Sequence, residues 1–391
     1  MAERETKILI IGNGFDLAHG LPTAYKDFMQ FCNVVPSDLL KNIEHNDVIK
    51  RDVITKWNIH SEIKAIIESA LDDTSVLEKE IMPMIQELND CIEENIWYEY
   101  FRKIEEKMKG DNWIDFESEI SDVIEYVDGK IDRLEKKYKR SDFVKNEVED
   151  LLGKNNKFFT IIFPGQQSTL SGREMRERCF NDLEKLTRAL EIYLSVFVEK
   201  IPCDKMDIIT RIQPDYVMNF NYTNTYERTY SINEEKPKVF HVHGECNAGK
   251  TMEDNNMVLG IDEYLKDERK DIHTNFSIFK KFVQRIRKRT GAGIYTIFEE
   301  VEYLYKNFSY ESTIYVFGHS LDKTDKDILS KFLGCKTTSV RVYCKDKGSE
   351  GELIAKMIQL IGQDNLVDKV YANPSKLEFE NHKIMSDYCS P

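Results

Sequence analysis

An asparagine and two histidines are the residues of this chain best placed to do chemistry. Asn221, His243 and His319 each come within two positions of the end of a short apolar run. An amide can orient a water molecule or a ribose hydroxyl, and an imidazole, which titrates near neutrality, can accept a proton. These residue types therefore suit attack at an anomeric carbon.

Each of these residues also has a structural interpretation. Asn221 and Asn224 fit turn positions, because asparagine tolerates left-handed backbone and bonds its own loop. His243, directly before Gly244, fits a turn histidine whose hydrogen bonds are satisfied. His241 fits that interpretation better, since it lies two residues back within the apolar run. The joint placement of several such loops favours a functional site.

The N-terminal part of the chain supplies a loop that suits a nucleotide. The apolar run 8–11 breaks at Gly12 and Gly14. Doubly wound α/β proteins begin a nucleotide site in this way, because closely spaced glycines let backbone N–H groups approach a pyrophosphate. The next glycine is Gly20, not residue 17 as in the dinucleotide fingerprint, which argues against a dehydrogenase. Taken alone, the two glycines also fit an ordinary strand-to-helix turn.

The long segment that follows has the pattern of helices. Apolar residues recur at spacings of three and four in 63–82, 114–134 and 178–200, as in amphipathic helices. The run 158–163 fits either a strand or a buried helix end. We therefore expect a large helical insertion over residues 36–205.

Short apolar runs return after residue 205, and each has the length of a strand. They lie at 216–220, 239–242, 257–259, 313–317 and 340–343. The pattern predicts an α/β fold with one Rossmann-like parallel sheet, formed by 1–35 and 206–391 and interrupted by the insertion. Ligands of such sheets bind at the carboxyl ends of the strands, where the polar loops would converge. The spacing of Thr324 and Asp327 predicts a helix start after the last of these loops.

Composition limits the classes of partner. The chain has 391 residues and a formal net charge of −14, which argues against a nucleic-acid or anionic-membrane partner. The basic stretch 280–289 is expected to be a solvated helix face, with a local nucleic-acid stripe as the alternative. No Cys-x-x-Cys pair and no apolar run near 18 residues is present, so we expect a cytoplasmic protein without a metal centre.

Four blocks of the sequence resemble one protein family. Residues 11–25, Ile-Gly-Asn-Gly-Phe-Asp-Leu-Ala-His-Gly-Leu-Pro-Thr-Ala-Tyr, are similar to the opening of the bacteriophage abortive-infection AbiH family. Asn-Phe-Asn-Tyr-Thr-Asn-Thr-Tyr-Glu (219–227), His-Val-His-Gly-Glu (241–245) and Phe-Gly-His-Ser-Leu-Asp-x-x-Asp (317–325) resemble it too. The resemblance implies a role in antiphage defence.

At greater distance the same blocks resemble the sirtuin-type fold. Gly12-Asn13-Gly14 stands at its Gly-Ala-Gly, Gly20-Leu21-Pro22 at its Gly-Ile-Pro, Phe220-Asn221-Tyr222 at its Gln-Asn-Ile and His243-Gly244 at its catalytic His-Gly. The resemblance implies a sheet of sirtuin type that binds NAD⁺, with Asn221 and His243 as the catalytic residues. The implied binding residues are Gly12, Asn13, Gly14, Phe15, Asp16, Leu21, Pro22, Thr23, Gly318, His319 and Ser320.

Departures from the sirtuin pattern argue against protein deacylation. The chain lacks the four-cysteine zinc module, Thr223 replaces the aspartate after the catalytic asparagine, and 23–25 replace Asp-Phe-Arg. The pattern is closer to sirtuin-like antiphage effectors that hydrolyse NAD⁺, which also lack the zinc module.

The leading hypothesis is an antiphage effector that cleaves the nicotinamide–ribose bond of NAD⁺. Asn221 would orient the attacking water, His243 would act as base, and the loop 12–16 would hold the pyrophosphate or a ribose. Such an enzyme must be restrained, so a homo-oligomer or a phage-derived trigger is expected. The alternatives are a catalytically silent nucleotide sensor that acts through a protein partner, and a nuclease-like toxin that uses 280–289.

Overall fold

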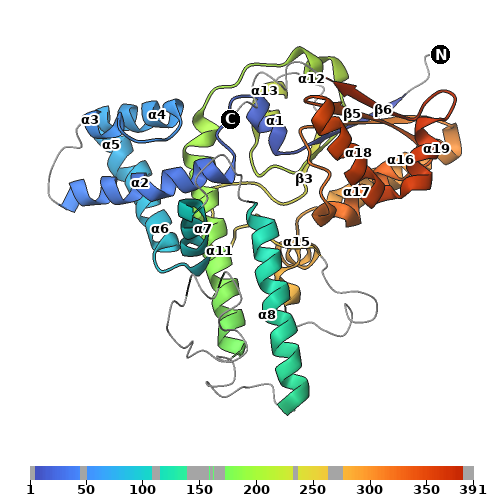
Figure 1. Ribbon diagram of the computed structural model, residues 1–391. Helices are drawn as coiled ribbons and strands as arrows, with labels where there is room; N and C mark the ends of the chain where they lie inside the picture. Colours follow the sequence, from blue (N-terminus) through green and yellow to red (C-terminus); the bar gives the residue numbers. More distant parts are fainter. Residues whose placement is uncertain are drawn as a thin grey trace. The chain divides into compact units, whose positions relative to one another are not determined.

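The computed structural model describes residues 5–44, 51–107, 115–138, 158, 162, 172–231, 237–262 and 276–381 (Figure 1). The chain divides into two compact units. The sheet unit comprises Met1–Ala24, Phe197–Cys246 and Lys288–Pro391, and the helical unit comprises Tyr25–Val196 and Asn247–Arg287. The helical insertion was predicted over residues 36–205. The helical unit has a similar first segment, Tyr25–Val196, and a second segment, Asn247–Arg287, that the prediction did not include.

The sheet unit contains six strands in the order β3-β2-β1-β4-β5-β6, and all neighbouring pairs are parallel. The strands are β1 Thr6–Ile11, β2 Tyr216–Asn219, β3 Lys238–His241, β4 Ser312–Phe317, β5 Thr338–Cys344 and β6 Leu377–Asn381. This order is that of a doubly wound fold, in which the chain builds outward from β1 in both directions. The predicted Rossmann-like α/β fold is confirmed.

Two of the strand expectations need correction. The run 257–259 belongs to the helical unit and is not a strand, although the neighbouring Ile261 forms an isolated bridge with Lys280. The strand β6 was missed because its sequence, Leu-Glu-Phe-Glu-Asn, is half polar. It pairs only with β5 at the edge of the sheet, where one side of the strand needs no apolar cover.

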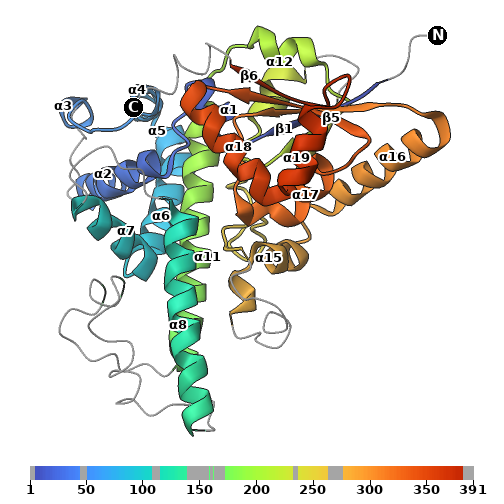
Figure 2. The ribbon, with the colours of Figure 1, turned by 45° about the vertical axis from the view of Figure 1, so that its right-hand side comes forward.

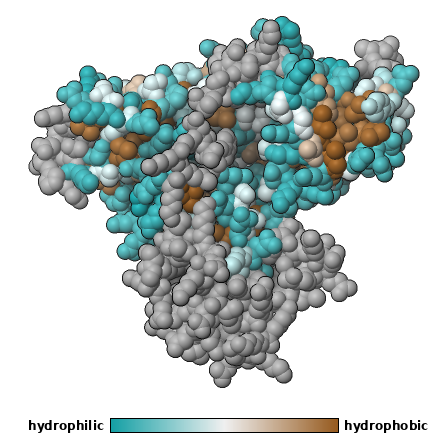
Figure 3. Space-filling model, viewed as in Figure 1, coloured by the Kyte–Doolittle hydropathy of each residue, from teal (hydrophilic) through white to brown (hydrophobic). Residues whose placement is uncertain are grey.

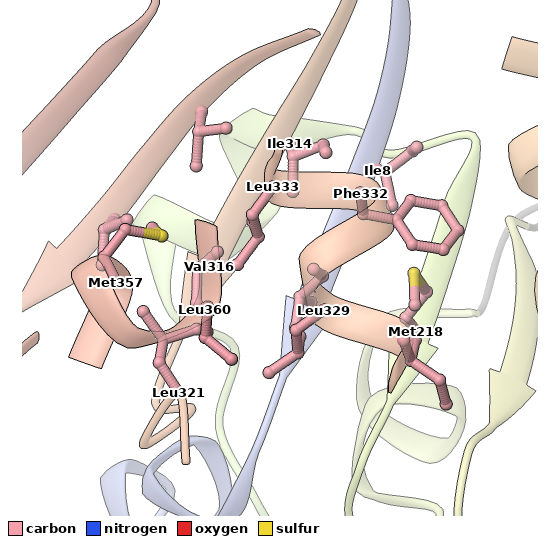
Figure 4. Packing of buried hydrophobic residues seen from close by; sticks show 14 of the residues in the cluster. Ile8, Met218, Ile314, Val316, Leu321, Leu329, Phe332, Leu333, Met357 and Leu360 are labelled. Atoms are coloured by element: carbon pink, nitrogen blue, oxygen red, sulfur yellow. The ribbon is translucent and has the colours of Figure 1, made fainter. Parts of the chain in front are cut away.

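The sheet is buried on both faces, which explains why its strands read as unbroken apolar runs. Ile8 and Ile10 of β1 belong to the core on one face, and Leu9 and Ile11 to the core on the other. The first core includes side chains of α16 to α19, helices that lie on one side of the sheet in Figure 2. Figure 4 shows the packing of this core around Leu329 and Phe332 of α17 and Leu360 of α18. The second core includes side chains of α1, α12 and α13.

The helices of the sheet unit are short, apart from two. They are α1 Asn13–Ala18, the 3-10 helix η2 Val198–Lys200, α12 Asp207–Ile212, α13 Thr225–Tyr230, α16 Ala292–Phe308, the 3-10 helix η4 Lys323–Asp325, α17 Lys326–Leu333, α18 Lys347–Ile361 and α19 Gln363–Val370. A helix was expected to begin near Thr324. The first helical turn there, η4, begins directly after Asp322, whose side chain accepts a hydrogen bond from the Thr324 amide. Asp322 is therefore the N-cap of η4.

The helical unit contains the amphipathic segments expected from the sequence. Its elements are α2 Tyr25–Glu44, α3 Arg51–Ile54, α4 Ser61–Asp72, α5 Thr74–Val76, the π-helix η1 Leu77–Ile81, α6 Met82–Ile92, α7 Ile96–Lys107, α8 Phe116–Tyr138, α11 Gly172–Val196, the 3-10 helix η3 Ser277–Phe279 and α15 Lys281–Lys288. The helix expected over 63–82 is interrupted at Asp73, which caps α5. Most of 158–163 lies outside the described residues.

Hydrophilic residues make up most of the coloured surface in Figure 3, and hydrophobic residues gather in smaller areas. Among the exposed apolar side chains are Ile358 of α18 and Val367 of α19. Within the described part of the chain, no helix combines the length and apolar character needed to cross a bilayer.

Candidate functional site

The candidate site lies at the carboxyl ends of β1 to β4. The strand order reverses at β1, which has β2 on one side and β4 on the other. In doubly wound sheets this topological switch point is where ligands bind, because the loops on either side diverge there. The loops that follow these strands carry every residue that the sequence assigned to the site, with Leu21–Thr23 reached just beyond α1.

The glycines after β1 pack against the loop after β4. A Cβ atom on Gly14 would lie 2.7 Å from the Cα of Gly318, and one on Gly12 would lie 2.8 Å from the Cα of His319. Gly318 has a φ of +66°, and its Cβ would lie 2.2 Å from the Phe15 nitrogen. Glycine is required here by the close approach of two backbones.

The amides of Gly12 and Gly14, which were expected to approach a pyrophosphate, form hydrogen bonds within the protein. The Gly12 amide donates to Phe317 O at 3.3 Å, and the Gly14 amide donates to Gly318 O at 2.8 Å. Both N–H groups therefore hold the two loops together. With both amides hydrogen-bonded in this way, a pyrophosphate bound at this edge would draw on other donors, and the approach of these two amides to the phosphates stays a prediction.

The rest of the N-terminal motif folds back onto the same loop. Thr23 Oγ1 donates to Asn13 Oδ1 at 2.6 Å, which ties the segment after α1 to its first residue. Phe15 lies in the core of the sheet unit, and Leu21 and Pro22 are buried. Their side chains therefore shape the loop from within the protein.

Asp16 is a buried carboxylic acid at the centre of this motif. Its Oδ2 accepts a hydrogen bond of 2.6 Å from Thr223 Oγ1, in the loop after β2. Its Oδ1 is buried and has no hydrogen-bond partner among the described residues. Burial raises the pKa of Asp16 to about 6, despite the opposing hydrogen bonds from Thr223 and Thr225. An acid of this kind can accept a hydrogen bond from a ligand hydroxyl at Oδ1.

Asn221 links the loop after β2 to the loop after β1. Its Nδ2 donates to Gly12 O at 3.1 Å, and its backbone amide donates to Asn219 Oδ1 at 2.9 Å. The side chain is buried and fixed in orientation by the first of these bonds. With the nitrogen directed to Gly12, the amide presents its oxygen as an acceptor.

His243 contacts a carboxylate that the sequence interpretation did not include. Its Nε2 lies 2.8 Å from Asp325 Oδ1, and both side chains are buried. His319 Nε2 lies 3.8 Å from Asp325 Oδ2, on the other oxygen of the same carboxylate. The Phe220 ring meets both imidazoles nearly edge-on, with centroid distances of 5.5 Å to His243 and 4.3 Å to His319.

His241, expected to be structural, forms a second pair with a carboxylate. Its Nε2 lies 2.7 Å from Glu227 Oε1, and its Nδ1 lies 3.3 Å from Asn221 O. Burial lowers the pKa of His241, but the hydrogen bond and charge of Glu227 outweigh burial, so the pKa lies above its usual value. The protonated ring can donate to both oxygens and hold the backbone of Asn221.

Asp325 and Glu227 were missed although both end motif blocks quoted from the sequence. Each stands in a helical turn beyond the polar loop, where a carboxylate ordinarily serves as a helix cap or a solvated residue. The remaining predicted residue, Ser320, is exposed at the end of the loop that carries Gly318 and His319. The structure thus brings Gly12, Asn221, His243 and His319 into one network and leaves Ser320 at its surface.

The basic stretch 280–289 belongs to the helical unit and the start of the next segment. Lys280, Lys281 and Arg285 are buried, and Lys281 Nζ lies 2.8 Å from Glu117 Oε2. The expectation of a solvated basic face is therefore wrong for these residues. Since they face the protein interior, they offer no charge to a nucleic acid.

Comparison with known families decides what kind of protein this is. The family model described as "Bacteriophage abortive infection AbiH" matches residues 8–344. The chain belongs to the AbiH family. Its members are thereby associated with abortive infection, the defence in which an infected cell stops phage propagation. No curated protein and no solved structure matches this AbiH chain, so the sirtuin-type resemblance stays a prediction from the motifs.

Proposed function

We propose that this AbiH protein is an antiphage effector that hydrolyses the nicotinamide–ribose bond of NAD⁺. The observation that supports this best is the buried His243–Asp325 contact, whose residues and Asn221 follow strands at the switch point of an all-parallel sheet. A proton acceptor, an amide oxygen and a nucleotide-type sheet edge are the parts that the reaction needs.

The reaction would proceed through an oxocarbenium-like state at the ribose C1′. The C1′–nitrogen bond breaks and nicotinamide leaves with the bonding electrons, while a water oxygen bonds to C1′. Asn221 Oδ1 would accept a hydrogen bond from that water, and His243 would take its proton. The products are nicotinamide, ADP-ribose and a proton that His243 releases to solvent. Orientation and exclusion of competing nucleophiles supply much of such a rate enhancement.

The binding roles follow from the groups that remain available. Asp16 Oδ1 suits a ribose hydroxyl, because it is a buried acceptor without a described partner. Asn13 and the loop Gly318–Ser320 flank the closely packed glycines and would meet the phosphates in place of the Gly12 and Gly14 amides. A trigger or an oligomer would control access, in keeping with an activity that must stay off before infection.

The test is direct measurement of products. Purified protein would be incubated with NAD⁺, and nicotinamide and ADP-ribose would be quantified by chromatography, with and without phage lysate as a source of trigger. We expect equal amounts of both products, and at least ~100-fold less of each from His243→Gln. Tight NAD⁺ binding by calorimetry without nicotinamide release under either condition would instead support the silent sensor.

A further inference from the structure

The buried carboxylate of Asp325 is not needed by the helix on which it stands. Asp325 is the N-cap residue of α17, yet its side chain makes no capping hydrogen bond. The preceding turn is capped by Asp322, through its contact with the Thr324 amide at 3.0 Å. A carboxylate placed in the interior without a helix to cap requires another partner, because burying a charge is costly unless it is paired.

The two carboxylate oxygens of Asp325 face the imidazoles of His243 and His319. The two rings differ in whether they can act as a base. His319 Nδ1 accepts a hydrogen bond of 2.9 Å from the Leu321 amide, so the proton of the neutral ring lies on Nε2, toward Asp325. A ring fixed in this way has no lone pair left to act as a base. His319 is therefore a poor proton acceptor.

His243 lies closer to the same carboxylate, with Nε2 2.8 Å from Oδ1 against 3.8 Å from Oδ2 for His319 Nε2. The geometry is that of an ion contact and not of a directed hydrogen bond, so the carboxylate acts on the ring through its charge. An anion at that distance favours the tautomer with the proton on Nε2, which leaves the lone pair on Nδ1. The groups that face this ring include the Asp325 carboxylate, the His319 imidazole across the same carboxylate, and the apolar Phe220 ring. Asp325 is the one anion among these contacts.

We propose that Asp325 is the positioning residue for His243 and thereby assigns Nδ1 as the atom that accepts the proton. The inference rests on the proposed function for the identity of the reaction. When Nδ1 takes the proton of the attacking water, the ring becomes an imidazolium, and the Asp325 carboxylate beside Nε2 stabilises its charge. The carboxylate stays ionised throughout, and no proton passes to it.

The kinetic test compares Asp325→Asn with Asp322→Asn, an identical change three residues earlier at the capping aspartate. We expect Asp325→Asn to lower kcat at least ~100-fold with little change in KM for NAD⁺. The acid limb of its kcat–pH profile should also move to lower pH, since the imidazolium loses its counter-charge. Asp322→Asn should leave kcat and the pH profile unchanged. Equal effects of the two variants would overturn the assignment.

A second measurement does not depend on activity or on a variant of Asp325. Histidine-¹⁵N-labelled wild-type protein would be titrated by NMR, with the His243 signals identified by their absence from His243→Gln. We expect neutral His243 to carry its proton on Nε2, and a proton on Nδ1 would overturn the inference. If the wild type releases no nicotinamide while His243 has the expected tautomer, the proposed function fails and the pairing stands. If nicotinamide is released but Asp325→Asn retains full kcat, the pairing role fails and the function stands.

Discussion

The two histidines near the end of β3 each meet a carboxylate, but they do so across very different distances in the fold. His241 pairs with Glu227 of α13, an element that directly follows the neighbouring strand β2. His243 pairs with Asp325, which follows β4 on the far side of β1. The side chains of the second pair are 5% and 7% exposed, against 12% and 29% for the first. The first pair is suited to hold a loop, and the second to hold a proton acceptor in a dry site.

The largest effect is expected from a change that pushes apart the loops after β1 and β4, the second of which leads to Asp325. Gly318→Ala forces a non-glycine residue to a φ of +66° and brings its Cβ within 2.2 Å of the Phe15 nitrogen. Strain and overpacking together should lower the free energy of unfolding by on the order of 3 kcal/mol or more. Thermal and denaturant unfolding would measure this.

Gly351→Ala in α18 is the matched control, because a Cβ atom added at that position would have open space around it, with no neighbour within 4 Å. It should be neutral or stabilising by ~0.5–1 kcal/mol. A Gly318→Ala protein as stable as this control would show that the two loops are not closely packed.

The His243–Asp325 and His241–Glu227 pairs should differ most clearly in their effect on NAD⁺ turnover. His243→Gln should lower NAD⁺ turnover ~10²–10⁴-fold, as expected for loss of a general base. His241→Gln should lower it less than tenfold while reducing stability, because it removes a donor to Asn221 O rather than the proton acceptor. Nicotinamide release and thermal unfolding would be measured for both. If His241→Gln proves the more damaging to turnover, the roles of the two pairs are reversed.

Double variants of Asn221 can show which of the two histidine–carboxylate pairs acts with it. Asn221→Ala should lower turnover about 100-fold through loss of positioning, with NAD⁺ binding still measurable by calorimetry. Since the Nδ2 bond to Gly12 O is also lost, unfolding should become easier by about 1 kcal/mol. Combined with His243→Gln, the change should add little further loss, because both groups act on one water. Combined with His241→Gln, the losses should add. Additive effects in the first double variant would assign Asn221 to binding.

The smallest effect expected is the dependence of stability on pH. The pKa of folded His241 lies above its usual value, so its contribution to stability is complete below the pKa of the unfolded chain, near 6.5. That contribution is lost as the pH rises through the folded pKa. Glu227→Gln should remove this part of the pH dependence, as judged by unfolding at pH 5.5 to 8.5. An unchanged slope would mean that His241 is neutral in the folded protein.

Sequence reasoning succeeded where one segment carries its own signal. The strands at the centre of the sheet are apolar on both faces, as Ile8 and Leu9 illustrate, so their runs were visible. The loops after them could be grouped because parallel strands share a carboxyl edge. Pairings between distant segments could not be read in this way. Nothing near Gly14 indicates that Gly318 packs against it, and nothing near Asp325 indicates that its side chain turns from its helix to His243.

The central position of β1 has a consequence for when the candidate site can be completed during synthesis. Asn221 reaches Gly12 across 209 positions of the chain, and β1 pairs with β4 only after residue 312 has been made. Closing loops of that length is entropically unfavourable, and folds dominated by such contacts form slowly. The first strand must therefore leave the ribosome and wait until most of the chain has followed. A nascent chain that ends before residue 325 lacks the His243–Asp325 contact, so the proposed site can be completed only once translation has passed the last of the four loops.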